Sequence, residues 1–209
     1  MLFRRKRKIC GEIESLCFDP GCFADSPERR FEERAAALRR ELGIAPEENV
    51  LLFTGAFEPE RRAAVLLDQF LAFRRSGSGA DWRLVLAGAG GEEPLLRRMA
   101  GENPAVHFLP PGREELPVLL RLADLVALVS RAESGEAAVA GAMACGRPVL
   151  VAEGVRAFRR VEPGKTGWCV DSAHPELWFD YPKAASGARL KEMGEAGRLE
   201  MLKNPYFFP

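Results

Sequence analysis

The stretch SRAESGEAAVAGAMACGRPVLVAEG, residues 130–154, carries the strongest fold signal in the sequence. It begins where an apolar run ends and passes through a polar turn. It then continues as a helix of small residues and enters a second apolar run at residues 148–151. Small residues let a crossover helix pack closely on a strand, so this order is typical of one unit of a parallel α/β sheet.

Short apolar runs recur before and after this stretch, and amphipathic segments separate them. Leu66, Leu67 and Phe70 recur at helical spacing in one such segment, and residues 116–123 form another. The alternation predicts an α/β domain with a Rossmann-like open parallel sheet flanked by helices. The predicted strands are residues 50–53, 82–86, 106–109, 125–129 and 148–151, with 168–170 as a shorter sixth.

The 209 residues and their 47% hydrophobic content suit one compact domain. Residues 1–26 show no clear period, and we predict an irregular, basic N-terminal segment there. Residues 27–42 are charged and alanine-rich, and Gly43 follows at a position where a helix can end. This pattern predicts an exposed helix before the first strand. We therefore assign residues 27–209 to the Rossmann-like domain.

Thirty basic and thirty acidic side chains cancel, so no overall field favours nucleic acid as a partner. The local exception is the basic run of Arg4, Arg5, Lys6, Arg7 and Lys8. Such a run can hold a protein weakly on an anionic membrane face, although a solvated tail is the simpler interpretation. No run of 18 apolar residues occurs, and no apolar segment follows the basic start. We therefore expect a cytoplasmic protein, at most peripheral at the inner membrane face.

The cysteines and histidines do not predict a metal site. The five cysteines are odd in number and show no C-x2-C pair, which favours reduced thiols. Three of them fall in the first 22 residues, so a metal or redox site there stays an alternative. His107 and His174 are interpreted as structural or surface side chains. We expect no cofactor.

Loops that follow the predicted strands carry the candidate ligand-binding residues, because ligands of open parallel sheets bind at the carboxyl ends of the strands. Gly55 starts a bend that leads to Arg61 and Arg62, whose guanidinium groups suit a phosphate. Two solvated surface arginines are the alternative. Gly88 opens a glycine-rich loop whose missing side chains would let a ligand approach the backbone. Position 93 is Glu, so this is not the dinucleotide fingerprint, and a nicotinamide enzyme is a poor fit.

Residues 142–149, Ala-Met-Ala-Cys-Gly-Arg-Pro-Val, resemble the donor-site signature of retaining glycosyltransferases with the GT-B fold. From about residue 18 to residue 198, the chain is similar to the C-terminal donor-binding domain of family 4 type enzymes, the glycosyl transferases group 1. The resemblance implies the C-terminal half of a GT-B fold and a nucleotide-diphospho-sugar donor. It also implies transfer with retention of configuration, in polysaccharide or glycolipid biosynthesis. A separate N-terminal acceptor domain or subunit would complete the cleft.

The same resemblance implies roles for individual residues. Glu133 falls on the first Glu of a Glu-x7-Glu pair, which contacts hydroxyls of the donor sugar. Arg61 falls on a lysine that clamps the diphosphate. Catalytic residues stay unassigned, because the acceptor-side groups of the family belong to the N-terminal domain. The implied donor-binding set is Gly55, Arg61, Gly88, Glu133, Ser134, Gly135 and Glu136.

Three positions depart from the family pattern. Ala56 replaces an arginine that helps to clamp the diphosphate. Glu136 replaces a glycine whose amide approaches the diphosphate, so it places one anion beside another. Gly141 replaces the second Glu of the pair, which holds the ribose, and Glu136 cannot substitute because five helical residues turn by about 500°. The alternative function is therefore a non-catalytic nucleotide-sugar-binding or regulatory module derived from a glycosyltransferase.

Overall fold

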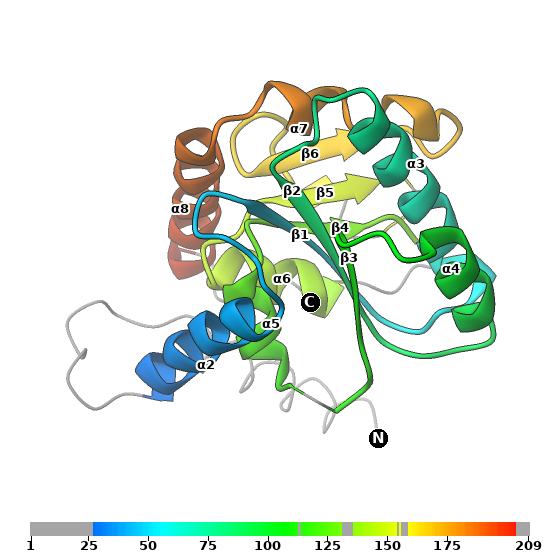
Figure 1. The fold of residues 1–209 in the computed structure, drawn as a ribbon. Coiled ribbons are helices and arrows are strands. Elements are labelled where there is room, and N and C mark those ends of the chain that lie inside the picture. Colours follow the sequence, from blue (N-terminus) through cyan, green and yellow to red (C-terminus); the bar gives the residue numbers. More distant parts are fainter. Residues whose placement is uncertain (1–26, 113, 131–135, 154, 156–158, 204–209) are drawn as a thin grey trace, which may run out of the picture.

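The computed structural model describes residues 27–112, 114–130, 136–153, 155 and 159–203. The irregular segment predicted for residues 1–26 lies outside the described residues, as does the basic run within it. The predicted α/β architecture is confirmed, with one parallel sheet between two layers of helices (Figure 1).

Six parallel strands form the sheet, in the order β3-β2-β1-β4-β5-β6. Each of the six predicted strands is confirmed to within one residue at either end. The order runs in one direction from β1 to β3 and in the other from β4 to β6, so it reverses between β1 and β4. The strands are β1 (Asn49–Thr54), β2 (Trp82–Ala87), β3 (Val106–Leu109), β4 (Leu125–Leu128), β5 (Val149–Ala152) and β6 (Gly167–Val170).

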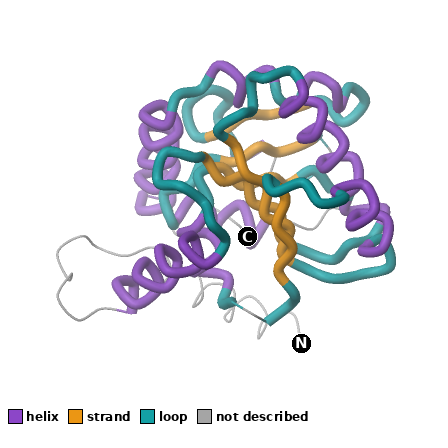
Figure 2. The backbone as a smooth tube through the Cα atoms, viewed as in Figure 1, coloured by secondary structure: helices purple, strands orange, loops and turns teal. Residues whose placement is uncertain are grey.

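Helices cover both faces of the sheet, and loops gather at its two edges (Figure 2). α2 (Pro27–Glu41), α5 (Leu116–Leu122) and α6 (Glu136–Ala144) lie on one face. The other face carries α3 (Ala63–Arg75) and α4 (Glu93–Ala100). Beyond β6 the chain forms the short helices η4 (Pro175–Leu177) and α7 (Asp180–Ala184) and then α8 (Gly187–Lys203), which packs on α6 and β6.

Two apolar clusters, one on each face of the sheet, form the core. Leu38 of α2 and Leu120 of α5 pack with Val126 of β4 on one face. Phe70 of α3 packs with Leu84 of β2 on the other. Because successive strand side chains point to opposite faces, strands covered on both sides need the near-continuous apolar runs seen in the sequence. None of the helices in the described part of the chain has both the length and the apolar character needed to cross a bilayer.

Candidate functional site

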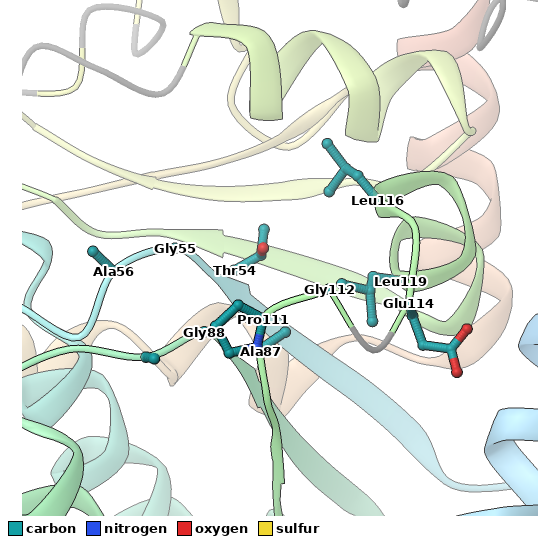
Figure 3. Close-up of a pocket in the computed structure, with 11 residues that line it drawn as sticks. Thr54, Gly55, Ala56, Ala87, Gly88, Pro111, Gly112, Glu114, Leu116 and Leu119 are labelled. Atoms are coloured by element: carbon teal, nitrogen blue, oxygen red, sulfur yellow. The ribbon is translucent and has the colours of Figure 1, made fainter.

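A cleft of about 460 Å³ opens at the carboxyl ends of β1, β2 and β3, beside α5 (Figure 3). It lies next to the reversal between β1 and β4, where open α/β sheets present their ligand sites. Gly55 and Gly88, both predicted from the sequence, line it together. The complete lining is Thr54, Gly55, Ala56, Ala87, Gly88, Ala89, Pro111, Gly112, Glu114, Leu116 and Leu119.

The loops after β1 and β2 pack backbone against backbone at this cleft. A Cβ atom added at Gly88 would lie 1.9 Å from the carbonyl oxygen of Gly55. The Gly55 amide donates a hydrogen bond to the carbonyl of Ala87 at 3.0 Å. The missing side chain of Gly88 therefore lets the neighbouring loop approach.

The η2 turn (Pro59–Arg61), which leads from β1 to α3, is tied to the glycine-rich loop by further backbone contacts. The amide of Phe57 donates to the carbonyl of Ala89 at 2.9 Å, and the amide of Glu92 donates to the carbonyl of Phe57 at 2.8 Å. The carboxylate of Glu58 accepts a hydrogen bond from the amide of Gly91 at 3.1 Å. These contacts join the loop after β1 to the loop after β2, both of which contribute residues to the cleft.

Arg61 and Arg62 have different environments, although they are adjacent in the sequence. Arg62 is only 6% exposed, and its Nη2 donates to the carbonyl of Ser172 at 2.9 Å. Its guanidinium also lies 4.8 Å from the ring centroid of Trp178. Arg61 ends the η2 turn and is half-buried, and no described carboxylate forms an ion pair with it. Arg62 is therefore held by contacts within the fold, whereas Arg61 keeps its charge without an ion-pair partner among the described residues; Arg61 does not line the cleft itself.

The start of the 130–154 segment meets the Arg61 turn. The buried Ser130 hydroxyl, which follows β4, donates to the carbonyl of Glu60 at 3.2 Å. This contact spans the reversal between β1 and β4 and places the two loops side by side. The predicted residues Glu133, Ser134 and Gly135 lie outside the described residues.

Two of the three positions that depart from the family pattern, Glu136 and Gly141, lie in α6. Glu136 is its first residue, although the placement of its side chain is not described, and Gly141 is buried within it. Gly141 has no side chain with which to reach a ligand.

The described lining of the cleft contains one ionisable side chain, Glu114, which the sequence analysis missed. Its carboxylate pairs with Arg34 of α2, with 3.1 Å between Nε and Oε2, and Glu41 pairs with the same arginine. Hydrogen bonds to Glu41 and Glu114 raise the pKa of Arg34. Ala56 is exposed at the rim and contributes no charge. The described lining of the cleft thus carries one negative charge and no arginine or lysine.

The two histidines lie away from the cleft, which agrees with their interpretation as structural or surface side chains. Burial lowers the pKa of His107 on β3, and the nearby Arg83 guanidinium adds to the shift. His174 is exposed, and its ring donates a hydrogen bond to the Asp171 carboxylate, which raises the pKa of the ring, with 2.7 Å between Nδ1 and Oδ2. Within the described residues, no group of three or more His, Cys, Asp or Glu side chains could hold a metal ion.

We expect His107 to titrate below, and His174 above, the ordinary histidine pKa of about 6.5. The stabilisation from protonated His174 is then complete below about pH 6.5 and is lost as the pH rises through its raised folded pKa. Burial of neutral His107 stabilises the fold above about pH 6.5 and ceases to do so in acid. Ring-proton NMR titration measures both values, and Asp171→Asn should lower the pKa of His174 alone. Equal titration of both rings would contradict the assignment.

Comparisons with known proteins agree with this geometry. The family model described as "Glycosyl transferases group 1" matches residues 48–181. A D-inositol 3-phosphate glycosyltransferase of Nocardia farcinica is 35% identical over 182 residues, which are 82% of this chain and 40% of that protein. The chain spans less than half of the length of the curated relatives it matches.

Solved structures share the fold. Anabaena HepE, solved in complex with UDP and glucose, superposes with a TM-score of 0.67 at 23% identity, covering 89% of this chain and 50% of that one. The C-terminal domain of the glycosyl transferase group 1 family protein LpcC from Francisella tularensis gives a TM-score of 0.65 at 15% identity. That match covers 90% of this chain and 96% of that one. At these identities the likeness shows the fold, which is that of a C-terminal GT-B half.

Proposed function

Because this chain belongs to the glycosyl transferases group 1 family, we propose that it is the donor-binding domain of a retaining glycosyltransferase that uses a nucleotide-diphospho-sugar. The proposed domain covers residues 27–209. The observation that carries the proposal is the meeting of the Gly55, Arg61 and Gly88 loops with the end of β4 at the reversal of strand order. The similarity to D-inositol 3-phosphate glycosyltransferases, and to HepE in complex with UDP and glucose, supports it.

The proposed role of the domain is binding and orientation. The backbone around Gly55 and Gly88 receives the nucleotide end of the donor, and Arg61 neutralises the diphosphate through its planar fork of donors. Glu133 accepts hydrogen bonds from two adjacent sugar hydroxyls, and Ser134, Gly135 and Glu136 complete the proposed donor-binding set. The proposal includes a separate N-terminal acceptor domain or subunit, which would close over the donor and exclude water.

The proposal also includes a cytoplasmic location with weak peripheral contact at the inner membrane face. The basic run of residues 4–8 is what supports this contact, since each basic side chain near an anionic surface adds about 1 kcal/mol. Binding to anionic vesicles that disappears at high salt, and after neutralisation of the run, is the expected result.

Calorimetric titration with nucleoside diphosphates and their sugar conjugates tests the function. We expect saturable binding, and we expect Glu133→Ala to weaken the sugar conjugate more than the bare diphosphate, because only the conjugate presents sugar hydroxyls. Glu60→Ala, an exposed carboxylate of the η2 turn, is a matched control that should leave this difference unchanged. Absence of nucleotide binding at millimolar concentration would refute donor binding and leave the non-catalytic module.

Ala56→Arg should strengthen diphosphate binding. Ala56 is exposed at the rim of the cleft, so an arginine can be accommodated without repacking the core. A second guanidinium near the diphosphate adds a charge-assisted hydrogen bond, which predicts an affinity gain of about tenfold. Titration with a nucleoside diphosphate measures it, and the gain should shrink as salt rises. Unchanged affinity would place the diphosphate away from this rim.

A further inference from the structure

One wall of the cleft comes from the loop after β3 and from the start of α5 (Figure 3). The described residues between β3 and α5 belong to neither a strand nor a helix, so no backbone ladder fixes their position. Other contacts have to hold this wall opposite the Gly55 and Gly88 loops. The residues that line the cleft from this side are Pro111, Gly112, Glu114, Leu116 and Leu119.

The Glu114 side chain is the main contact between this loop and α2. Figure 3 shows its carboxylate directed away from Gly55 and Gly88, and the side chain is only 6% exposed. Arg34 of α2 donates to both carboxylate oxygens, from Nε to Oε2 at 3.1 Å and from Nη2 to Oε1. A forked pair of this kind fixes the orientation of the carboxylate as well as its position. It therefore anchors the cleft wall to a helix 80 residues away in the sequence.

Arg34 is itself held from a second side. Its Nη1 donates to the carboxylate of Glu41, which lies two turns further along the same face of α2. The helix packs on α5, where Leu38 of α2 and Leu119 belong to one apolar cluster. The guanidinium of Arg34 thus has a fixed place relative to both α2 and the wall of the cleft.

A second ion pair joins α2 to the same loop, but its environment differs. Arg30 donates to Glu115 at 3.0 Å, and their side chains are 70% and 65% exposed. An ion pair this exposed to water contributes little, because solvent and salt screen it. Glu115 does not line the cleft, whereas Glu114 does. Of these two pairs, only Arg34–Glu114 connects α2 to a lining residue.

The interior of the cleft has little charge once the Glu114 carboxylate is taken up by Arg34. The other described lining side chains are uncharged, and Thr54 supplies the one hydroxyl among them. A mainly apolar cleft of this kind suits the uncharged base of a nucleotide better than its diphosphate. Movement of the wall should therefore affect the nucleoside end of the donor first.

We propose that Arg34 is a positioning residue for the donor nucleotide. Through Glu114 it holds the wall of the cleft against the nucleoside, although Arg34 itself does not line the cleft. The inference rests on the proposed function, because it concerns the same cleft. It adds a residue of α2 to those that determine nucleotide affinity.

Calorimetric titration of the full chain tests this role. The probes are inorganic pyrophosphate and whichever of UDP, GDP and ADP the wild type binds most tightly. Arg34→Leu should weaken nucleotide binding about tenfold, because the unpaired Glu114 carboxylate turns toward water and moves the loop with it. Pyrophosphate has no nucleoside, so its affinity should stay within about twofold of the wild-type value. Arg34→Lys should recover part of the loss, since it keeps the charge but not the fork.

Arg30→Leu is the matched control, because it removes the exposed pair between the same helix and the same loop. It should leave nucleotide affinity unchanged. Equal nucleotide affinity of the wild type and Arg34→Leu would overturn the role of Arg34 and leave the proposed function standing. A parallel loss of nucleotide and pyrophosphate binding would also overturn it, because a general loss of structure affects both probes.

Glu114→Gln provides a second test in case Arg34→Leu does not fold. The substitution keeps the shape of the side chain and removes its charge, so nucleotide binding should weaken severalfold while pyrophosphate binding is kept. Unchanged nucleotide affinity of this variant would overturn the inference. Failure of the wild type to bind all three nucleotides would instead refute the proposed function, and the role of Arg34 would fall with it.

Discussion

Gly88→Ala is expected to destabilise the domain by about 3 kcal/mol and to remove nucleotide binding, because the change forces apart the two loops that form the cleft. The new Cβ would lie 1.9 Å from the Gly55 carbonyl oxygen and 3.1 Å from a ring carbon of Phe57. A backbone oxygen cannot swing away as a flexible side chain could. Either the Gly55 loop moves, or the Gly88 loop leaves its hydrogen bond to Leu109.

Denaturant unfolding and nucleotide titration of the same samples measure both effects. Gly91→Ala is the matched control in the same loop, because its Cβ would meet only the Glu58 carboxylate, at 3.6 Å, in ordinary van der Waals contact. We expect the control to unfold within about 0.5 kcal/mol of the wild type. If Gly88→Ala were as stable as Gly91→Ala, the inferred close contact between the Gly55 and Gly88 backbones would be wrong.

The strands were predictable from the sequence, and some helices were not, for one physical reason. A strand buried on both faces must be apolar along its whole length. Each apolar run can therefore be recognised in the sequence without knowing which strands pair with it. α4 was missed because it has only eight residues and buries only Leu96 and Ala100. Such a short helix gains its stability from packing on α3, and its eight residues are fewer than the roughly 11–18 over which a helical period is recognised.

The candidate site was predictable only in part, because contacts with residues far away in the sequence decide which of its side chains the fold holds in place. Gly55 and Gly88 were expected from their position after strands, and the structure brings them together. Arg61 and Arg62 look alike in the sequence. They differ in the fold because Arg62 contacts Ser172, 110 residues away. The burial of Glu114 likewise depends on Arg34 of a separate helix, and no local sequence pattern predicts such an ion pair.

Substitution of the two adjacent arginines should separate ligand binding from stability. Arg61→Ala is expected to weaken nucleoside diphosphate binding by about 10- to 100-fold, because a charge-assisted bond to phosphate is lost. It should leave the free energy of unfolding within about 0.5 kcal/mol of the wild type, since Arg61 has no described ion-pair partner. Arg61→Lys should recover part of the affinity, because it keeps the charge but not the fork.

Arg62→Ala is expected to give the opposite pattern, with about 1–3 kcal/mol of stability lost and nucleotide affinity kept. The change removes the hydrogen bond to Ser172 and the contact with Trp178, which join the start of α3 to the loop after β6. Affinity is measured by calorimetry well below the unfolding transition, and stability by denaturant titration. If Arg61→Ala bound the diphosphate as the wild type does while Arg62→Ala lost it in a folded protein, Arg62 would be the phosphate ligand. The role inferred for Arg61 from its available guanidinium would then be wrong.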